Sequence, residues 1–155
     1  MSSTIKRLIV CLTIPLGVGA LSALISMGAM DAFKNLNQPP LSPPGWLFPV
    51  VWTFLYLLMG FSLFLVTGMP SSTDKTQGIL LFAIQLFFNF MWSILFFNLE
   101  LYFFSFIWLV GLWALIILMI TEFKKVSPLA AYINIPYLLW VTFAGYLNLA
   151  IALLN

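Results

Sequence analysis

Residues 39–60 read PPLSPPGWLFPVVWTFLYLLMG, a proline-rich segment that leads directly into an apolar, aromatic-rich one. Two Pro-Pro pairs stiffen the first part, because each ring fixes φ and restricts the backbone of the preceding residue. We expect Pro44 to lie in the first turn of a helix, where a missing backbone N–H breaks no hydrogen bond. A stiff loop followed by an aromatic helix indicates a place where a flat ligand is held.

The composition excludes a water-soluble domain. Of the 155 residues, 63% are hydrophobic and only 6% are charged, which leaves too few polar side chains to cover a soluble fold. The charged residues separate five long uncharged intervals, residues 8–30, 35–73, 76–99, 101–121 and 126–155. Each can hold the roughly 20 apolar residues that cross a bilayer core of about 30 Å. The sequence therefore predicts an all-α integral membrane protein that spans the lipid bilayer five times.

We expect residues 1–155 to form a single domain, a bundle of five transmembrane helices. The predicted helices cover about residues 5–27, 44–66, 78–98, 101–120 and 128–154, and a longer loop of about residues 28–43 joins the first two. Short connections make sequential helices antiparallel neighbours. The first apolar run is longer than that of a signal peptide, so we interpret it as a retained helix. Within it, Gly19 and Ala23 form a small-xxx-small pair that allows close helix packing.

The distribution of Lys and Arg predicts the orientation. The N-terminus and the connections between helices 2 and 3 and between helices 4 and 5 share one side, which holds Lys6, Arg7, Lys75, Lys124 and Lys125. The opposite side holds only Lys34. The positive-inside rule therefore predicts a cytoplasmic N-terminus and an outside position for the loop between helices 1 and 2. The net charge of +2 is small and dispersed, so we expect no nucleic-acid partner.

Polar residues inside apolar helices are costly, and they mark contacts or binding positions. The third predicted helix carries Gln85, Asn89 and Ser93 at i, i+4 and i+8, on one face. Hydrogen bonding between helices is the simpler interpretation of such a stripe, and a ligand site is the alternative.

Two other helices carry aromatic residues on one face. The second has Phe48, Trp52, Tyr56 and Gly60 at i, i+4, i+8 and i+12, and the fifth has Tyr137, Trp140, Ala144 and Asn148 at i, i+3, i+7 and i+11. If these faces and the polar stripe turn inward, they enclose a cavity with aromatic walls and a few amide and hydroxyl groups. Such a cavity suits a large, flat, mostly apolar ligand. Trp46, near a helix end, is expected to anchor at the membrane interface.

Conventional catalysis has little support in the sequence. There is no histidine and only one cysteine, so neither a metal site nor a bound cofactor is expected. The four carboxylates, of Asp31, Asp74, Glu100 and Glu122, all fall in predicted loops or at helix ends. Of the charged residues only Asp31 and Lys34 are placed to meet a charged group on a ligand, and a solvated loop is the simpler interpretation of both.

Three motifs together resemble one family. The run PPGWLFPVVWTFLYLLMG over residues 43–60 resembles the TspO/translocator protein family, also called tryptophan-rich sensory proteins or peripheral benzodiazepine receptors. Helix 3, with Gln85, Asn89 and Trp92, and the run PYLLWVTFAGYLN over residues 136–148 carry the same resemblance. The motifs occur in the expected order and cover essentially the whole chain, which resembles a bacterial member located in the cell membrane.

The resemblance implies a five-helix bundle, often a homodimer, that binds porphyrins and, in animal members, cholesterol and benzodiazepine-type drugs. It implies a ligand pocket beneath the loop between helices 1 and 2, with Trp52 and Trp140 facing the ligand. Residue patterns and resemblance together give these candidate ligand-binding residues: Pro43, Pro44, Phe48, Trp52, Tyr56, Gln85, Asn89, Phe90, Tyr137, Trp140, Ala144 and Asn148. The sterol-recognition pattern requires a basic residue after a tyrosine. No basic residue follows Tyr146, so we expect weak or no sterol binding.

Three functions remain open on these grounds. The first is a membrane receptor or sensor that binds a tetrapyrrole such as protoporphyrin IX, or a benzodiazepine-type ligand, by aromatic stacking without metal coordination. The second is a porphyrin-degrading activity, linked in the family to oxidative stress, in which Trp52 and Trp140 are the reactive groups. The third is a porphyrin or lipid transporter, and the lack of charges within the helices argues against ion coupling.

Overall fold

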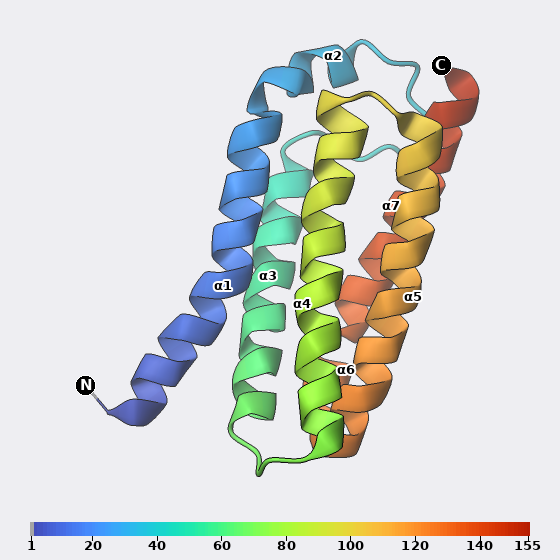
Figure 1. Ribbon diagram of the computed structural model, residues 1–155. Helices are drawn as coiled ribbons and strands as arrows, with labels where there is room; N and C mark the ends of the chain where they lie inside the picture. Colours follow the sequence, from blue (N-terminus) through green and yellow to red (C-terminus); the bar gives the residue numbers. More distant parts are fainter. Residues whose placement is uncertain (1) are drawn as a thin grey trace.

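The computed structural model describes residues 2–155, and every regular element in this range is helical. Within it five helical segments are long and apolar enough to cross a membrane: Ser3–Lys34, Leu47–Thr67, Thr73–Asn98, Tyr102–Val126 and Pro128–Leu154. They run side by side along the length of the bundle (Figure 1). The predicted all-α membrane fold with five spanning helices is confirmed.

The first span extends further than expected. Helix α1 (Ser3–Ser26) continues through a 3₁₀ turn, η1 (Met27–Ala29), into the short helix α2 (Met30–Lys34). The loop expected from residue 28 therefore begins as helix, and the irregular segment is residues 35–46. Pro15 lies inside α1, and the N-terminal half of α1 leans away from the other helices (Figure 1).

Helix α3 (Leu47–Thr67) begins three residues later than predicted, so the expectation that Pro44 lies in its first turn is wrong. The Pro44 carbonyl instead accepts a hydrogen bond from the Leu47 N–H at 3.0 Å, which closes a turn before the helix. Pro49 occupies the first helical turn in its place, where its missing N–H is harmless. Trp46 precedes the helix and is 67% exposed, as an interfacial side chain would be.

The third and fourth spans are both longer than predicted. Helix α4 (Thr73–Ser93) begins five residues early, because the Ser72 hydroxyl accepts a hydrogen bond from the Lys75 N–H and caps its first turn. It ends in a π-helical turn, η2 (Ile94–Asn98), and a tight connection leads to α5 (Tyr102–Val126).

The fifth span is broken near its start, where one helix was predicted. The short helix α6 (Pro128–Tyr132) is followed by α7 (Ile135–Leu154). Pro136 lies in the first turn of α7 and cannot donate to the carbonyl four residues earlier, so the helix is interrupted before it. At the break, the buried Asn134 amide donates to the Ser62 hydroxyl on α3 at 2.7 Å, which ties the interruption to the bundle.

Close packing of α1 on α3 depends on two glycines. A Cβ atom at Gly60 would lie 2.7 Å from the Leu12 Cα atom, and a Cβ atom at Gly19 would overlap the Tyr56 ring. Helices in a membrane associate through such small residues, because hydrocarbon offers no hydrophobic drive between them. The expected close approach at Gly19 is therefore present, and its partner is α3.

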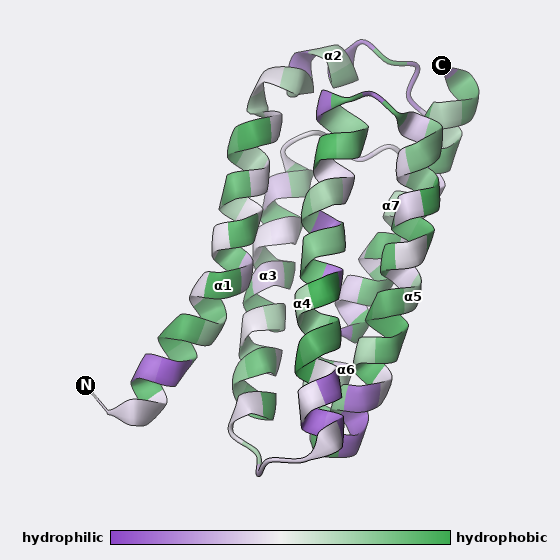
Figure 2. Ribbon diagram, in the orientation of Figure 1, coloured by the Kyte–Doolittle hydropathy of each residue, from purple (hydrophilic) through white to green (hydrophobic). Residues whose placement is uncertain are grey.

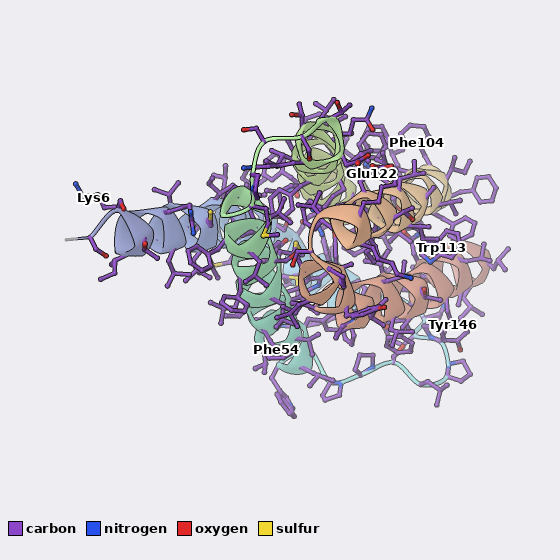
Figure 3. All side chains as sticks on the ribbon, turned by 90° about the horizontal axis from the view of Figure 1, so that it is seen from below. Lys6, Phe54, Phe104, Trp113, Glu122 and Tyr146 are labelled. Atoms are coloured by element: carbon purple, nitrogen blue, oxygen red, sulfur yellow. The ribbon has the colours of Figure 1, made fainter. Side chains whose placement is uncertain are left out.

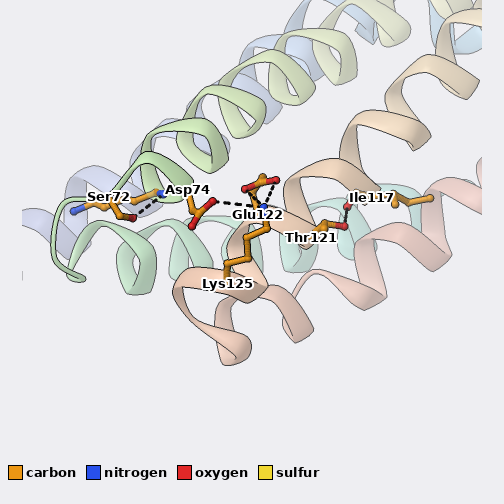
Figure 4. A network of polar contacts seen from close by, with 7 residues as sticks. Ser72, Asp74, Ile117, Thr121, Glu122 and Lys125 are labelled. Atoms are coloured by element: carbon orange, nitrogen blue, oxygen red, sulfur yellow. Dashed lines mark hydrogen bonds and ion pairs between the residues drawn. The ribbon is translucent and has the colours of Figure 1, made fainter.

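The outer surface is apolar along the spans and polar at the two ends (Figure 2). Phe54 and Phe104 point outward from the bundle (Figure 3) and are 55% and 50% exposed. Trp113 is 39% exposed and lies between α5 and α7, where its indole N–H donates to Thr142. At the end that carries the N-terminus, the Lys125 ammonium lies 2.8 Å from Glu122 and 3.5 Å from Asp74, and so links α5 to α4 (Figure 4). A long apolar belt between two polar ends matches a bilayer.

Candidate functional site

A small cavity lies beneath the irregular segment 35–46, at the end of the bundle opposite the N-terminus. Its volume is about 30 Å³, which is room for about one water molecule. Four of the candidate residues named above line it: Pro43, Phe48, Ala144 and Asn148. The space beneath the segment therefore holds no more than about one water molecule in this structure.

Sequence reasoning missed most of the wall of this cavity. The additional lining residues are Phe33, Gln38, Ser42, Trp92, Phe96, Phe97, Leu147 and Ile151. A signal was available for some of them, because Trp92 follows Asn89 by three residues, while Ala144, Leu147, Asn148 and Ile151 share one face of a helix. Phe33 and Gln38 carried no periodic signal, since Phe33 lies in the five-residue helix α2 and Gln38 in the irregular segment 35–46.

The Asn148 amide makes three hydrogen bonds at the edge of the cavity. Its Oδ1 atom accepts from the Trp92 indole N–H at 2.9 Å and from the Ser105 hydroxyl at 3.1 Å. Its Nδ2 atom donates to the Tyr102 carbonyl at 2.7 Å. These bonds connect α4, α5 and α7, so Asn148 fixes the position of the Trp92 ring.

Gln85 and Asn89 of the polar stripe on α4 lie deeper in the bundle and belong to a chain of hydrogen bonds across three helices. The third member of the stripe, Ser93, instead shares a hydrogen bond with Ser26 of α1. The Tyr56 hydroxyl on α3 donates to Asn89 Oδ1 at 2.9 Å, and Asn89 Nδ2 donates to the Tyr137 hydroxyl on α7 at 2.9 Å. The Tyr137 hydroxyl in turn donates to Gln85 Oε1 at 2.7 Å. All four residues are buried. In this structure they bond to one another, which is the helix-joining role that the simpler interpretation of the stripe predicts.

Trp52 packs between the cavity and this chain of hydrogen bonds. Its ring stacks on Tyr56 with centroids 5.6 Å apart, and lies 6.2 Å from the Tyr137 ring and 6.3 Å from the Trp92 ring. Three helices therefore contribute to one aromatic cluster below the cavity. This cluster provides apolar, polarisable surfaces of the kind on which a flat conjugated ligand stacks.

Trp140 presents a different feature, a buried donor that has no acceptor. Its indole Nε1 atom is inaccessible to solvent and makes no hydrogen bond within residues 2–155. By contrast, the indole N–H groups of Trp92, Trp108 and Trp113 all donate. The Trp140 ring lies 6.0 Å from the Phe48 ring, which lines the cavity. A buried N–H group without a partner costs free energy of desolvation, so a ligand that brings a hydrogen-bond acceptor to this position would be stabilised.

Two candidate residues lie apart from the others. Pro44 is exposed, one residue beyond the lining residue Pro43. Phe90 faces a lateral groove between α1 and α4 and does not reach the cavity beneath residues 35–46. On an α-helix Phe90 is one position, or about 100°, from Asn89, so the two point to different sides of α4.

The segment over the cavity is tied down by polar contacts at its edge. Asn37 exchanges two hydrogen bonds with the side chain of Asn155, and its own side chain donates to the Leu154 carbonyl at 3.3 Å. The Tyr146 hydroxyl donates to the Pro40 carbonyl at 2.8 Å. We call residues 35–46 the lid. It is attached to α7 by a few exposed hydrogen bonds, each of which is individually weak.

Charged groups contribute little to the cavity. The carboxylate of Asp31 and the ammonium group of Lys34 lie 3.0 Å apart on the outer surface of α2, and both side chains are largely exposed. Within residues 2–155 there is no cluster of three or more His, Cys, Asp or Glu residues that could hold a metal ion. What the site offers is aromatic surface, one free N–H donor and a lid.

Comparison with known proteins identifies the family. The profile of the TspO/MBR family matches residues 11–154. The chain is 39% identical to the tryptophan-rich protein TspO of Chlorobaculum tepidum, over 100% of this chain and 99% of that protein. It is 36% identical to protein CrtK of Rhodobacter capsulatus, over 88% and 85% of the two chains, and 32% identical to the translocator protein of Bos taurus, over 75% and 70%. The match runs from within the first span to the end of the fifth, so this chain belongs to the TspO/MBR family of membrane proteins.

Proposed function

We propose that this protein is a membrane receptor that binds a tetrapyrrole such as protoporphyrin IX beneath the lid, without coordinating a metal. The observation that carries the proposal is the buried Trp140 N–H group, which has no acceptor within residues 2–155 and lies beside Phe48 on the wall of the cavity. A pyrrole-derived ligand with carboxylate or carbonyl substituents supplies that acceptor, while its flat ring stacks on the aromatic side chains.

The chemistry of the walls supports an apolar, flat ligand. Nine of the twelve residues around the cavity are aromatic or aliphatic, and the sequence contains no histidine that could act as an axial ligand to haem iron. We therefore expect metal-free protoporphyrin to bind about as tightly as haem. Other flat hydrophobic molecules, including benzodiazepine-type compounds, would use the same surfaces, and sterols would bind weakly or not at all.

Binding requires the lid to lift. A ligand pocket commonly has a volume of roughly 300–1,000 Å³, whereas the closed cavity holds about 30 Å³. The lid contacts α7 through the exposed hydrogen bonds of Asn37 and Tyr146, which can open at low cost. The ligand would then displace the lid outward and occupy the space between Phe48, Trp140 and the Trp52 cluster.

The test is a protoporphyrin IX titration in the dark, followed by quenching of tryptophan fluorescence. Trp140→Phe keeps an aromatic ring but removes the free N–H group, so affinity should fall roughly fivefold, the value of about one hydrogen bond. Trp113→Phe is the matched control, because that indole lies outside the site and donates to Thr142. Unchanged affinity in Trp140→Phe, or haem binding that is tighter by orders of magnitude, would contradict the proposal.

A second candidate function is light-dependent porphyrin breakdown, and one arrangement favours it. Trp52 contacts the rings of Tyr56, Tyr137 and Trp92, so four oxidisable rings adjoin one another below the cavity. If light and dioxygen drive a reaction that uses these indoles, Trp52→Phe should retain binding and lose breakdown of protoporphyrin under illumination. Equal breakdown rates in wild type, Trp52→Phe and Trp140→Phe would leave the receptor function alone.

The distribution of charge supports one orientation in the cell membrane. Five of the six Lys and Arg residues lie at one end of the bundle. This end holds the N-terminus, the α3–α4 connection and the end of α5. We propose that this end is cytoplasmic and that the lid faces outward. We also propose that the protein forms a homodimer, as the family resemblance implies. Cross-linking in native membranes would test this.

A further inference from the structure

A larger groove lies on the outside of the bundle, away from the lid. It has a volume of about 410 Å³ and runs between α1 and α4, with Leu63 of α3 at its floor. Ile14, Val18 and Leu21 form the α1 side, and the α4 side is formed by residues that include Ile79 and Ala83. Every lining residue is aliphatic or phenylalanine, so within a membrane this groove is filled with hydrocarbon.

One end of the groove is basic on both walls. Arg7 precedes Ile14 by seven residues on α1, and Lys75 precedes Ile79 by four residues on α4. Residues four or seven apart share one face of a helix, so each basic residue continues the groove-facing stripe of its own wall. The apolar groove therefore has an Arg and a Lys at the same end.

The two basic side chains also converge on the C-terminal end of α3. The Arg7 guanidinium carbon lies 4.7 Å from the centroid of the Phe64 ring, and a Cβ atom at Gly68 would lie 2.9 Å from one of its nitrogens. The Lys75 ammonium donates to the carbonyls of Thr67 and Met69 at 3.1 and 2.6 Å. Arg7 and Lys75 thus flank the same few residues at the mouth of the groove.

No acidic group neutralises this pair. Within residues 2–155, no carboxylate lies within 4.0 Å of the Arg7 or Lys75 side chain. The carboxylates at this end of the bundle, Asp74 and Glu122, are paired with Lys125 (Figure 4). In addition, the Arg7 Nε atom is buried and makes no hydrogen bond in the described part of the chain. The mouth of the groove therefore holds two cations without a carboxylate partner, and an anion with hydrogen-bond acceptors would neutralise them.

We propose that this groove binds an anionic phospholipid, with one acyl chain between α1 and α4 and the phosphate between Arg7 and Lys75. The occupant must combine a long apolar part with a negative headgroup at the end of the spanning segments, and a phospholipid of the adjacent leaflet has both. Phosphate oxygens accept strong, charge-assisted hydrogen bonds from guanidinium and ammonium groups. Basic pockets between transmembrane helices bind anionic headgroups in this way.

A second copy of the chain fits the groove less well. A symmetric partner would have to place a group against Arg7, and the carboxylates that it carries at this end are already paired with its own Lys125. The groove and its basic mouth also lie on the side and end of the bundle away from the lid. This inference is therefore independent of the tetrapyrrole site.

Native mass spectrometry of delipidated protein tests the headgroup. Phosphatidylglycerol and phosphatidylcholine with identical acyl chains are titrated separately, and phosphatidylglycerol should be retained more tightly. Arg7→Gln and Lys75→Gln should each weaken phosphatidylglycerol binding roughly fivefold. Lys124→Gln is the matched control, since Lys124 is exposed at the same end of the bundle but lies on α5. Equal retention of the two lipids, or equal losses in all three variants, would overturn the proposal.

The acyl-chain part is tested by filling the groove and by labelling the unmodified protein. Ala83→Trp should reduce lipid retention, whereas Ala114→Trp, at an exposed alanine on α5, should not. Wild-type protein in vesicles that contain phosphatidylglycerol with a photoreactive diazirine in its acyl chain should be labelled on the groove faces of α1 and α4. Labelling spread evenly over all spans, or a dimer that Ala83→Trp dissociates, would show that the groove has another occupant.

Discussion

Asn155, just beyond the end of α7, holds the backbone of Asn37 at two points. Its Oδ1 atom accepts from the Asn37 N–H at 2.9 Å, and its Nδ2 atom donates to the Asn37 carbonyl at 3.2 Å. The two residues are 118 positions apart in sequence. This paired contact joins the lid to the last helix, so it bears directly on how the cavity opens.

Removing the contact should accelerate ligand binding. Asn155→Ala deletes the two exposed hydrogen bonds to Asn37, together with a third to the Ile151 carbonyl within α7. Each bond to the lid is worth on the order of 1 kcal/mol or less, so its loss lowers the cost of lifting the lid. We expect protoporphyrin association to become roughly fivefold faster, measured by stopped-flow quenching of tryptophan fluorescence. Asn35→Ala is the control, because that side chain donates to the Asp31 carbonyl and does not reach α7. The role of the lid contact would be refuted if both variants associated at the wild-type rate.

The buried chain of hydrogen bonds should contribute to stability. Tyr137→Phe removes the hydroxyl that accepts from Asn89 and donates to Gln85, and it leaves two buried polar groups without a partner. We expect a loss of about 1–2 kcal/mol in the free energy of unfolding, the upper end of values for polar contacts between membrane helices.

Reversible unfolding in mixed detergent micelles measures this loss. The matched control is Tyr132→Phe, since the Tyr132 ring is 55% exposed and carries no buried hydroxyl. A Tyr137→Phe protein as stable as Tyr132→Phe would mean that the chain of hydrogen bonds adds no net stability.

Packing of α1 on α3 should be sensitive to a single methyl group at Gly60. In Gly60→Ala the new Cβ atom would lie 2.7 Å from Leu12 Cα and 2.8 Å from the Cys11 carbonyl oxygen, so backbone must move. The expected cost is about 1–3 kcal/mol. Gly17→Ala applies the same substitution where no atom lies within 4 Å and should be neutral or slightly stabilising. Thermal unfolding of the two variants in one detergent compares them directly, and equal melting temperatures would contradict the close contact.

Filling the cavity should block the ligand. Ala144 is 6% exposed and lines the cavity beneath the lid, so Ala144→Leu places three more carbon atoms where the ligand ring would lie. Protoporphyrin affinity should fall by at least about tenfold, which corresponds to roughly 1.4 kcal/mol. Ala114→Leu, on the lipid-facing side of α5, should bind as wild type does. Wild-type affinity in Ala144→Leu would place the ligand elsewhere.

The sequence by itself determined the class of the fold. The chain contains uncharged apolar intervals that are long enough to cross the bilayer. Such intervals cross as helices, because backbone groups in hydrocarbon must form hydrogen bonds within their own segment. The same reasoning identified residues 85, 89, 137 and 148 as buried polar positions, since polar side chains in such spans face other helices. All four are buried in the bundle.

Helix ends were less predictable, because local capping decides them. The side chain of Ser72 starts α4 early, and the interruption before Pro136 divides the last span. Hydropathy predicts neither the early start of α4 nor the break in the last span, since both depend on individual hydrogen bonds at the ends of apolar segments.

Only the tertiary structure decided which side chains meet. Periodicity places Trp52 and Trp140 on inward faces, but it does not reveal that Trp52 joins a packed aromatic cluster while the Trp140 N–H group has no partner in the described chain. Nor does it connect Asn37 to Asn155, because residues so far apart in sequence come together only through the packing of whole helices. Periodicity reports the face of one helix, whereas a site depends on the rotation and depth of several helices relative to one another.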